Sequence, residues 1–190
     1  MPPPIAGAAD GIFYRDLREP HIIADESAIT LATTQKALWA PARTILPANY
    51  WRTGKVVKLT AFGKFTSGTT PGNGTPAMAY GAGDAPTPIV TGTARALVAS
   101  VTNITWFMQG YMEFRGTPGT ASASRMWGMF VGDLAMQLST NQPNIFPASA
   151  PADVNIDTTV GTNAVTFQYA RSGSTAESMT TTGLLFEALN

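Results

Sequence analysis

The chain has 190 residues, of which 44% are hydrophobic and 13% charged, and its 12 basic and 12 acidic residues cancel. Soluble domains typically carry about 25% charged residues, so this surface suits contact with partners better than isolation in water. The balanced charge argues against a nucleic-acid partner. The absence of cysteine excludes disulfides and thiolate chemistry. No run reaches the roughly 20 apolar residues that a membrane span needs, so no membrane partner is expected.

Residues 1–30 are predicted to form an extended arm ahead of a domain at 31–190. Prolines at positions 2, 3, 4 and 20 restrict φ and remove backbone donors, so the arm is expected to be extended rather than helical. Such a segment cannot bury its apolar side chains on itself, so we expect them to dock on a neighbouring protein. These candidate docking residues are Ile5, Ile12, Phe13, Tyr14 and Leu17.

Beyond the arm, short apolar segments alternate with turns rich in Gly, Thr and Pro. Alternation with a period of two predicts strands, which we place at residues 29–31, 36–39, 44–47, 57–65, 77–82, 94–101, 103–115, 125–138, 154–156, 165–169 and 179–189. We expect loops at 66–76, 85–91 and 141–151. No segment has a strong helical period with capping residues. Close turn signals between roughly eight to ten strands predict an all-β sandwich or barrel.

The segments 103–115 and 125–138 are the clearest strands, and the turn-rich loop between them predicts a β-hairpin. If the turn is centred on Gly119, Glu113 lies opposite Arg125, which suits a cross-strand ion pair. One face of each segment is apolar and is expected in the core, as are Phe65 and Phe167. The hairpin's core residues are Ile104, Trp106, Met108, Met112 and Phe114, followed by Met126, Phe130, Leu134, Met136 and Leu138.

The other face of this hairpin mixes polar residues with large apolar ones. Leaving several large apolar side chains in water forgoes roughly 1.5–3 kcal/mol for each, so we expect this face to contact other copies of the chain in a homotrimer. The predicted trimer interface consists of Phe107, Tyr111, Trp127, Met129 and Val131. An alternative use of Tyr111 and Trp127 is a stacking platform for sugar rings.

The residues that carry chemistry do not form a recognisable catalytic set. The single histidine, His21, lies in the arm and has no nucleophile at a known motif. Asp153 and Asp157 lie four positions apart, or about 13 Å along a strand, which exceeds the roughly 5–9.5 Å between the carboxylates of glycosidases. We therefore predict no enzymatic activity, no catalytic residue and no cofactor. No spaced carboxylate motif predicts a metal site, although loop carboxylates leave a calcium ion possible.

Several runs resemble the jelly-roll (TNF-like) virion proteins of tailed bacteriophages. Leu46-Pro-Ala-Asn49, Trp51-Arg-Thr-Gly-Lys55 and Thr60-Ala-Phe-Gly63 look like the first core strands of that family. Trp106-Phe-Met-Gln-Gly110, with Arg115 beyond it, is similar to the central hairpin, and Ala176-Glu-Ser-Met179 leads into a similar last strand at 184–190. The resemblance covers about residues 33–190.

This resemblance implies an all-β jelly-roll sandwich of about eight to ten antiparallel strands. Such proteins are head decoration (cement) proteins, head fibres or tail-fibre domains, and they are commonly trimeric. We therefore expect a homotrimer on the capsid exterior that binds the lattice of the major capsid protein, with the arm as its main tether. The alternative is a receptor-binding domain of a tail fibre or spike that recognises a glycan of the host surface.

Overall fold

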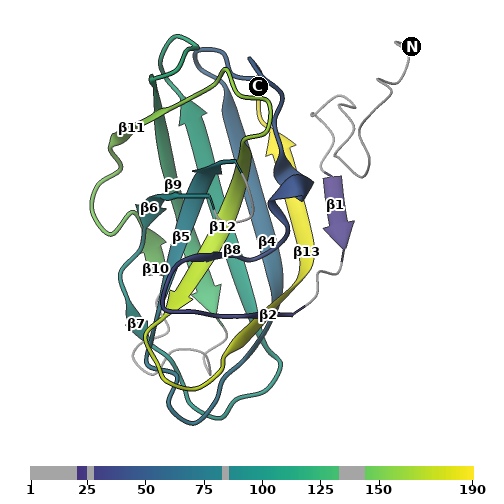
Figure 1. Cartoon of the computed structure of the whole chain (residues 1–190), viewed down its shortest axis with the longest axis vertical. Helices are drawn as coiled ribbons and strands as arrows, with labels where there is room; N and C mark the ends of the chain where they lie inside the picture. Colours follow the sequence, from purple (N-terminus) through teal and green to yellow (C-terminus); the bar gives the residue numbers. More distant parts are fainter. Residues whose placement is uncertain (1–20, 25–27, 83–85, 133–143) are drawn as a thin grey trace.

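The computed structural model describes residues 21–24, 28–82, 86–132 and 144–190, and for 21–24 and 130–132 it describes the backbone alone. In this part of the chain thirteen strands and one short 3-10 helix follow one another (Figure 1). They are β1 (His21–Ala24), β2 (Ile29–Thr30), β3 (Lys36–Ala37), η1 (Pro41–Thr44), β4 (Val56–Thr66), β5 (Asn73–Gly81), β6 (Pro88–Thr91), β7 (Arg95–Ala96), β8 (Ile104–Phe114), β9 (Ser122–Gly132), β10 (Asn144–Phe146), β11 (Asp153–Ile156), β12 (Ala164–Arg171) and β13 (Ser178–Ala188).

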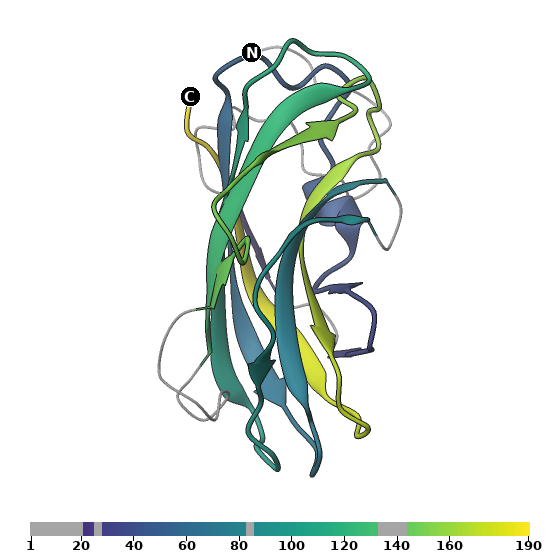
Figure 2. The same ribbon diagram turned by 90° about the vertical axis from the view of Figure 1, so that its left-hand side faces the viewer.

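The strands form two antiparallel sheets that lie face to face (Figure 2). The eight-stranded sheet has the order β1-β13-β4-β8-β9-β10, with β2 also on β13 and β11 also on β9. The five-stranded sheet has the order β3-β12-β5-β6, with β7 also on β5. The chain crosses repeatedly from one sheet to the other, as in jelly rolls. The predicted all-β jelly-roll sandwich is therefore confirmed.

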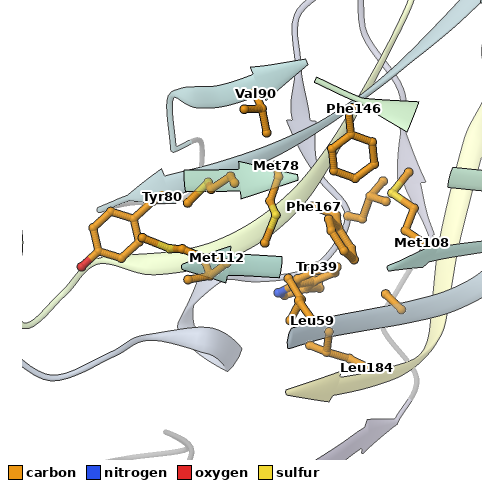
Figure 3. Close-up of a cluster of buried hydrophobic side chains, with 14 of the residues drawn as sticks. Trp39, Leu59, Met78, Tyr80, Val90, Met108, Met112, Phe146, Phe167 and Leu184 are labelled. Carbon is orange, nitrogen blue, oxygen red and sulfur yellow. The ribbon is translucent and has the colours of Figure 1, made fainter. Parts of the chain in front are cut away.

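The core lies between the two sheets and is rich in aromatic and methionine side chains (Figure 3). Phe167 on β12 lies at its centre, with its ring centroid 5.8 Å from that of Trp39 and 6.0 Å from that of Phe146, both edge-on. Such edge-to-face contacts add to the stabilisation from burial alone. The described core predictions are confirmed, because all of these side chains are buried: Phe65, Trp106, Met108, Met112, Phe114, Met126 and Phe167.

The hairpin of β8 and β9 has the predicted register, because Glu113 pairs with Arg125. Gly110 and Gly128 are opposite each other in its middle. A Cβ atom at Gly110 would lie 2.8 Å from the Phe167 ring, and one at Gly128 would lie 2.6 Å from the Phe146 ring. These two glycines therefore let core aromatics approach the hairpin backbone. Ile104 is only partly buried against the core, and Leu134, Met136, Leu138 and the Phe130 side chain lie outside the described residues.

Several predictions about strands were wrong. The segments 85–91 and 141–151, predicted as loops, contain β6 and β10, and β9 begins three residues before the predicted start. β6 and β10 are too short for periodicity to identify, and each forms by pairing with a long neighbour, β5 or β9. The predicted strand at 44–47 is replaced by η1 and an isolated bridge at Ile45.

The last part of the predicted arm belongs to the large sheet. β1 pairs with β13 at residues 183–186, and β2 pairs with β13 at Met179 and Ser178. These residues are extended, as expected, and they pair with β13 of the same chain. The reason is that β13 would otherwise present an unpaired row of backbone donors and acceptors at the sheet edge.

The described residues contain no helix long and apolar enough to cross a membrane. No group of three or more histidine, aspartate or glutamate side chains in the same part of the chain could hold a metal ion.

Candidate functional site

The outward face of the eight-stranded sheet carries large apolar side chains in three neighbouring rows. Residues that pair in register put their side chains on the same face, so the strand pairing defines each row. From β13 outward across the sheet, the first row contains Leu185, Thr60, Gln109, Met129 and Ile145. The second row contains Gly183, Phe62, Phe107 and Val131. The third row contains Glu187, Lys58, Tyr111 and Trp127.

Seven apolar side chains of these rows form what we call the outer patch. Three of them are well exposed, because Phe62, Met129 and Ile145 keep 46%, 39% and 62% of their surface in contact with solvent. The remaining four are half-buried: Phe107, Tyr111, Trp127 and Leu185. Most of the buried side chains of the protein lie between the sheets, so these exposed ones are not needed for the core. An exposed apolar patch of this kind usually marks an interaction site.

Tyr111 and Trp127 are stacked against each other at one end of the outer patch. Their ring centroids are 5.6 Å apart and their planes differ by 17°, the offset arrangement that aromatic pairs favour. Part of one face of each ring is therefore covered by the other ring. The Tyr111 hydroxyl donates to Gln109 Oε1 at 3.3 Å, and Gln109 Nε2 donates to Thr60 Oγ1 at 3.4 Å. These polar groups are thus satisfied within the chain.

Phe62 is held on this face by a glycine on the neighbouring strand. It pairs with Gly183, where the register of β13 shifts after Thr181. A Cβ atom at Gly183 would lie 2.1 Å from the Phe62 ring, so the ring occupies the space above the glycine. An aromatic ring that covers a cross-strand glycine stabilises the pair. Phe62 therefore has a fixed position beside Phe107.

The charged groups that flank the patch are mostly paired with one another. Lys58 Nζ lies 2.8 Å from Glu187 Oε2 in the third row. Beyond that row, Asp153 Oδ1 lies 3.2 Å from Arg125 and 3.7 Å from Arg115. Arg125 thus contacts Asp153 of β11 rather than its predicted partner Glu113, because β11 pairs with β9 at this position. Glu113 lies 3.7 Å from Arg115 instead.

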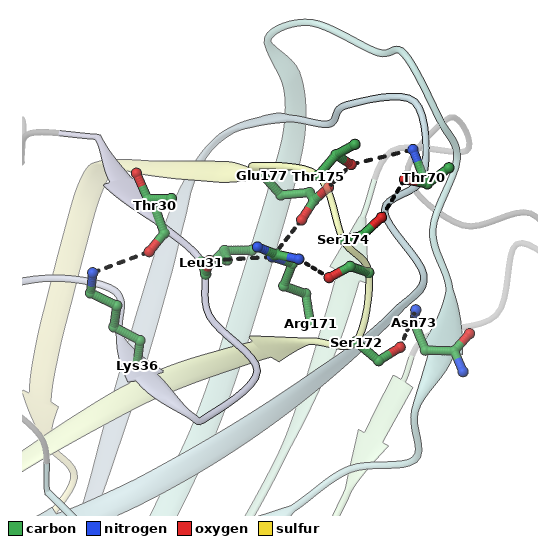
Figure 4. A network of polar contacts seen from close by, with 11 residues as sticks. Thr30, Leu31, Lys36, Thr70, Asn73, Arg171, Ser172, Ser174, Thr175 and Glu177 are labelled. Atoms are coloured by element: carbon green, nitrogen blue, oxygen red, sulfur yellow. Dashed lines mark hydrogen bonds and ion pairs between the residues drawn. The ribbon is translucent and has the colours of Figure 1, made fainter.

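A second polar cluster lies at the opposite end of the strands, around the β12–β13 loop (Figure 4). The carboxylate of Glu177 has no solvent exposure and its Oε2 lies 2.6 Å from Arg171 Nε. Arg171 also donates to the carbonyl oxygens of Leu31 and Gly173, and the Thr175 hydroxyl donates to the second carboxylate oxygen of Glu177 at 2.6 Å. This cluster joins the segment after β2 to the β12–β13 loop.

Four of the five predicted interface residues lie on the outer face as the pattern indicated: Phe107, Tyr111, Trp127 and Met129. Val131 pairs with Phe107, but its side chain lies outside the described residues, as do all five candidate docking residues of the arm. The sequence reasoning missed Phe62, Leu185 and Ile145. Phe62 alternates in step with Lys58 and Lys64, so its position on the outward face could have been predicted from the sequence. The position of Ile145 could not be predicted without knowing that β10 forms.

Comparisons with known proteins identify no family. No protein-family model matches the chain, and no curated protein matches its sequence. Among solved structures, it matches an alginate lyase mutant in complex with an alginate trisaccharide, at 10% sequence identity and a TM-score of 0.28, over 92% of this chain and 100% of that chain. Because that protein is a lyase, this match contradicts our prediction that the chain is not an enzyme, and we withdraw that exclusion. A likeness at this TM-score indicates neither the fold nor the activity of this chain.

Proposed function

We propose that this chain is a structural subunit of a bacteriophage particle, a homotrimeric decoration protein that binds the major capsid protein lattice on the capsid exterior. The observation that carries the proposal is the outer patch, because a β-sandwich with a spare apolar face needs a partner to cover it. The jelly-roll order of the strands supports the family resemblance of the sequence. The low charge of the chain also suits a protein covered by neighbours.

The arm is the proposed contact with the capsid lattice. β1 and β2 attach the N-terminal segment to the edge of the large sheet along β13. A protein that binds residues 1–20 is therefore tethered to this edge of the sandwich. The apolar residues Ile5, Ile12, Phe13, Tyr14 and Leu17 lie in that segment and supply the surface that would dock on the capsid protein.

Binding to empty capsids tests this function. We expect the full chain to sediment with capsids, and a variant that lacks residues 1–20 to remain a folded oligomer that no longer does so. A second variant replaces the five apolar arm residues by serine in the full-length chain. It keeps the length of the arm and should also abolish binding. Capsid binding by the truncated chain equal to that of the full chain would overturn the role of the arm. No binding by the full chain would overturn the decoration function.

Recognition of a host glycan by a tail fibre or spike is a second candidate, favoured by one observation. The stacked rings of Tyr111 and Trp127 lie beside the Lys58–Glu187 ion pair, and an aromatic surface next to planar polar groups can bind a sugar ring. If this function is the correct one, host oligosaccharide should protect Trp127 from a water-soluble fluorescence quencher, and Trp127→Ala should abolish that binding while the fold is retained.

A further inference from the structure

We infer that the outer patch binds the first part of the arm of its own chain, residues 1–20, before any other protein covers it. We call this segment the arm tip. The arm tip and the patch then hide each other's apolar side chains in the free protein. The inference goes beyond the proposed function, because it concerns the chain before assembly. Neither the capsid lattice nor a second copy can bind these surfaces while the arm tip lies on the patch.

The arm joins the large sheet at the level of the patch. β1 begins at His21, which pairs with Phe186 on β13, and β1 is a terminal strand of this sheet. The next residue of β13 is Glu187, the first member of the third row, and that row crosses the sheet to Trp127. A segment that precedes His21 therefore starts beside the row that leads to the aromatic end of the patch.

The length of the arm tip is sufficient to cross the patch. At roughly 4.8 Å per strand, Phe62 on β4 lies about 10 Å from β1 and Trp127 on β9 lies about 19 Å from it. Leu17 precedes His21 by four residues and Phe13 precedes it by eight. At about 3.3 Å per extended residue, they reach about 13 Å and about 26 Å. The order of the apolar residues along the arm tip thus matches the width of the patch.

The chemistry of the arm tip suits an aromatic surface. It contains five large apolar residues and three consecutive prolines. Proline-rich segments bind surfaces lined by aromatic rings, because a chain that is already extended loses little entropy on binding. The stacked Tyr111 and Trp127 supply such rings. β10 pairs with residues 128–130 of β9 and β11 with residues 122–125, so one side of Trp127 has no strand partner among the described residues.

The polar groups around the patch allow an apolar cover. Tyr111 donates to Gln109, Gln109 donates to Thr60, and Lys58 is paired with Glu187. Covering them leaves no unpaired charge in an apolar contact, which would be costly. The segment that covers this face therefore needs no charged group of its own.

The covalent link compensates for the modest size of the patch. A separate partner loses translational and rotational freedom on binding, whereas the arm tip is already held at the sheet edge by β1. A short link places a ligand at an effective concentration in the millimolar range. An apolar surface that is too small to hold a separate molecule can therefore hold a segment of the same chain.

Quenching of tryptophan fluorescence by acrylamide tests this contact. Three of the four tryptophans are each 2% exposed, namely Trp39, Trp51 and Trp106. Trp127 is half-buried and is therefore the one that solvent reaches. We expect Trp127 to be protected in the full monomeric chain and to be quenched in a chain that lacks residues 1–20. Equal quenching of the two chains would overturn the inference. Trp127→Phe in the truncated chain should remove the quenched emission and so identifies its source.

Two full-length variants separate the apolar side chains of the arm tip from its length. The first replaces the five apolar arm residues by serine, and it should expose Trp127 as the deletion does. The matched control also carries five serines and should leave Trp127 protected; it replaces Ala6, Ala8, Ala9, Asp10 and Glu19. Equal loss of protection in both variants would overturn the inference. Circular dichroism checks that each variant keeps the fold.

Dilution distinguishes the arm tip of the same chain from that of another copy. A contact within one chain does not depend on concentration, so Trp127 should stay protected when the monomeric protein is diluted further. Protection that is lost on dilution would assign the contact to another copy and would overturn the inference.

Removal of the arm tip should also strengthen the association of copies. If the arm tip occupies the patch about nine-tenths of the time, the association constant should rise by about tenfold or more in the chain without residues 1–20. Sedimentation equilibrium measures this, and equal association of the two chains would overturn the inference. Protection of Trp127 without capsid binding would leave the inference standing and overturn only the decoration function. Capsid binding without protection would do the reverse.

Discussion

Two glycines of the β8–β9 hairpin, Gly110 and Gly128, make room for core aromatic rings. Gly128 lies beneath the Phe146 ring, where an added methyl group would lie 2.6 Å from ring carbons and 2.5 Å from the carbonyl oxygen of Gln109. We therefore expect Gly128→Ala to lower the free energy of unfolding by about 1–3 kcal/mol, as overpacked cores do. Gly119 is the matched control because its nearest neighbour would be 3.6 Å away. Equal melting temperatures of the two alanine variants would contradict this packing.

Trp106 links the core to the backbone of the neighbouring strand. Its ring is 2% exposed and its indole N–H donates to the carbonyl oxygen of Lys64 at 3.1 Å. We expect Trp106→Ala to cost about 3–5 kcal/mol of stability, because it leaves a large cavity and an unpaired carbonyl group. Trp127→Ala should cost clearly less in a monomer, since Trp127 is only half-buried. Chemical denaturation of both variants at a concentration below self-association measures the difference.

The Arg171 side chain connects the β12–β13 loop to the segment after β2, which is far away in the sequence. Arg171 Nε lies between the Glu177 carboxylate and the carbonyl oxygen of Leu31, so the pair fastens the segment after β2 to the β12–β13 loop. We expect Arg171→Met to cost about 3–5 kcal/mol, because it leaves a buried carboxylate without its counter-charge. The double variant Arg171→Met/Glu177→Met should recover part of this loss. A single variant as stable as the natural chain would show that the pair does not hold the two elements together.

At the scale of elements, β1 protects the edge of the large sheet. Its removal would leave the backbone groups of β13 at residues 183–186 without their outer partner. A chain without residues 1–26 should therefore exchange amide hydrogens at these positions faster than one without residues 1–20. Hydrogen exchange followed by mass spectrometry measures this. Identical exchange in the two truncated chains would mean that β1 does not stay on β13.

Long strands could be predicted from the sequence because each has an alternating pattern over many residues. β8 alternates over eleven residues, and its partner register followed from the position of Gly119. β10 has only three residues, and its formation depends on β9 rather than on its own sequence. The residues of the outer patch that lie on the β8–β9 hairpin were predicted from the sequence. The other members of the patch could not be predicted, because the neighbours of β8 and β9 in the sheet come from distant parts of the chain.

At the scale of the whole molecule, the type of force that joins copies can be measured. The outer patch is apolar and its flanking charges are mostly paired, so screening by salt should matter little. We expect the association constant to change less than about threefold between 0.05 and 0.5 M salt, and to fall on cooling, as hydrophobic contacts do. Sedimentation velocity at several salt concentrations and temperatures gives both dependences. A steep loss of association with salt would indicate an electrostatic contact instead.

The ends of the large sheet also limit how far an assembly can grow. At one end, β1 and β2 cover β13 in two short pieces, and at the other end β10 and β11 each cover only part of β9. Neither end offers a long straight strand, which is what another sheet needs in order to extend the hydrogen-bonded ladder. Fibres that lengthen by adding strands are therefore disfavoured, even though the chain is rich in β-structure and poor in charge. A concentrated solution should accordingly bind little thioflavin and stay clear.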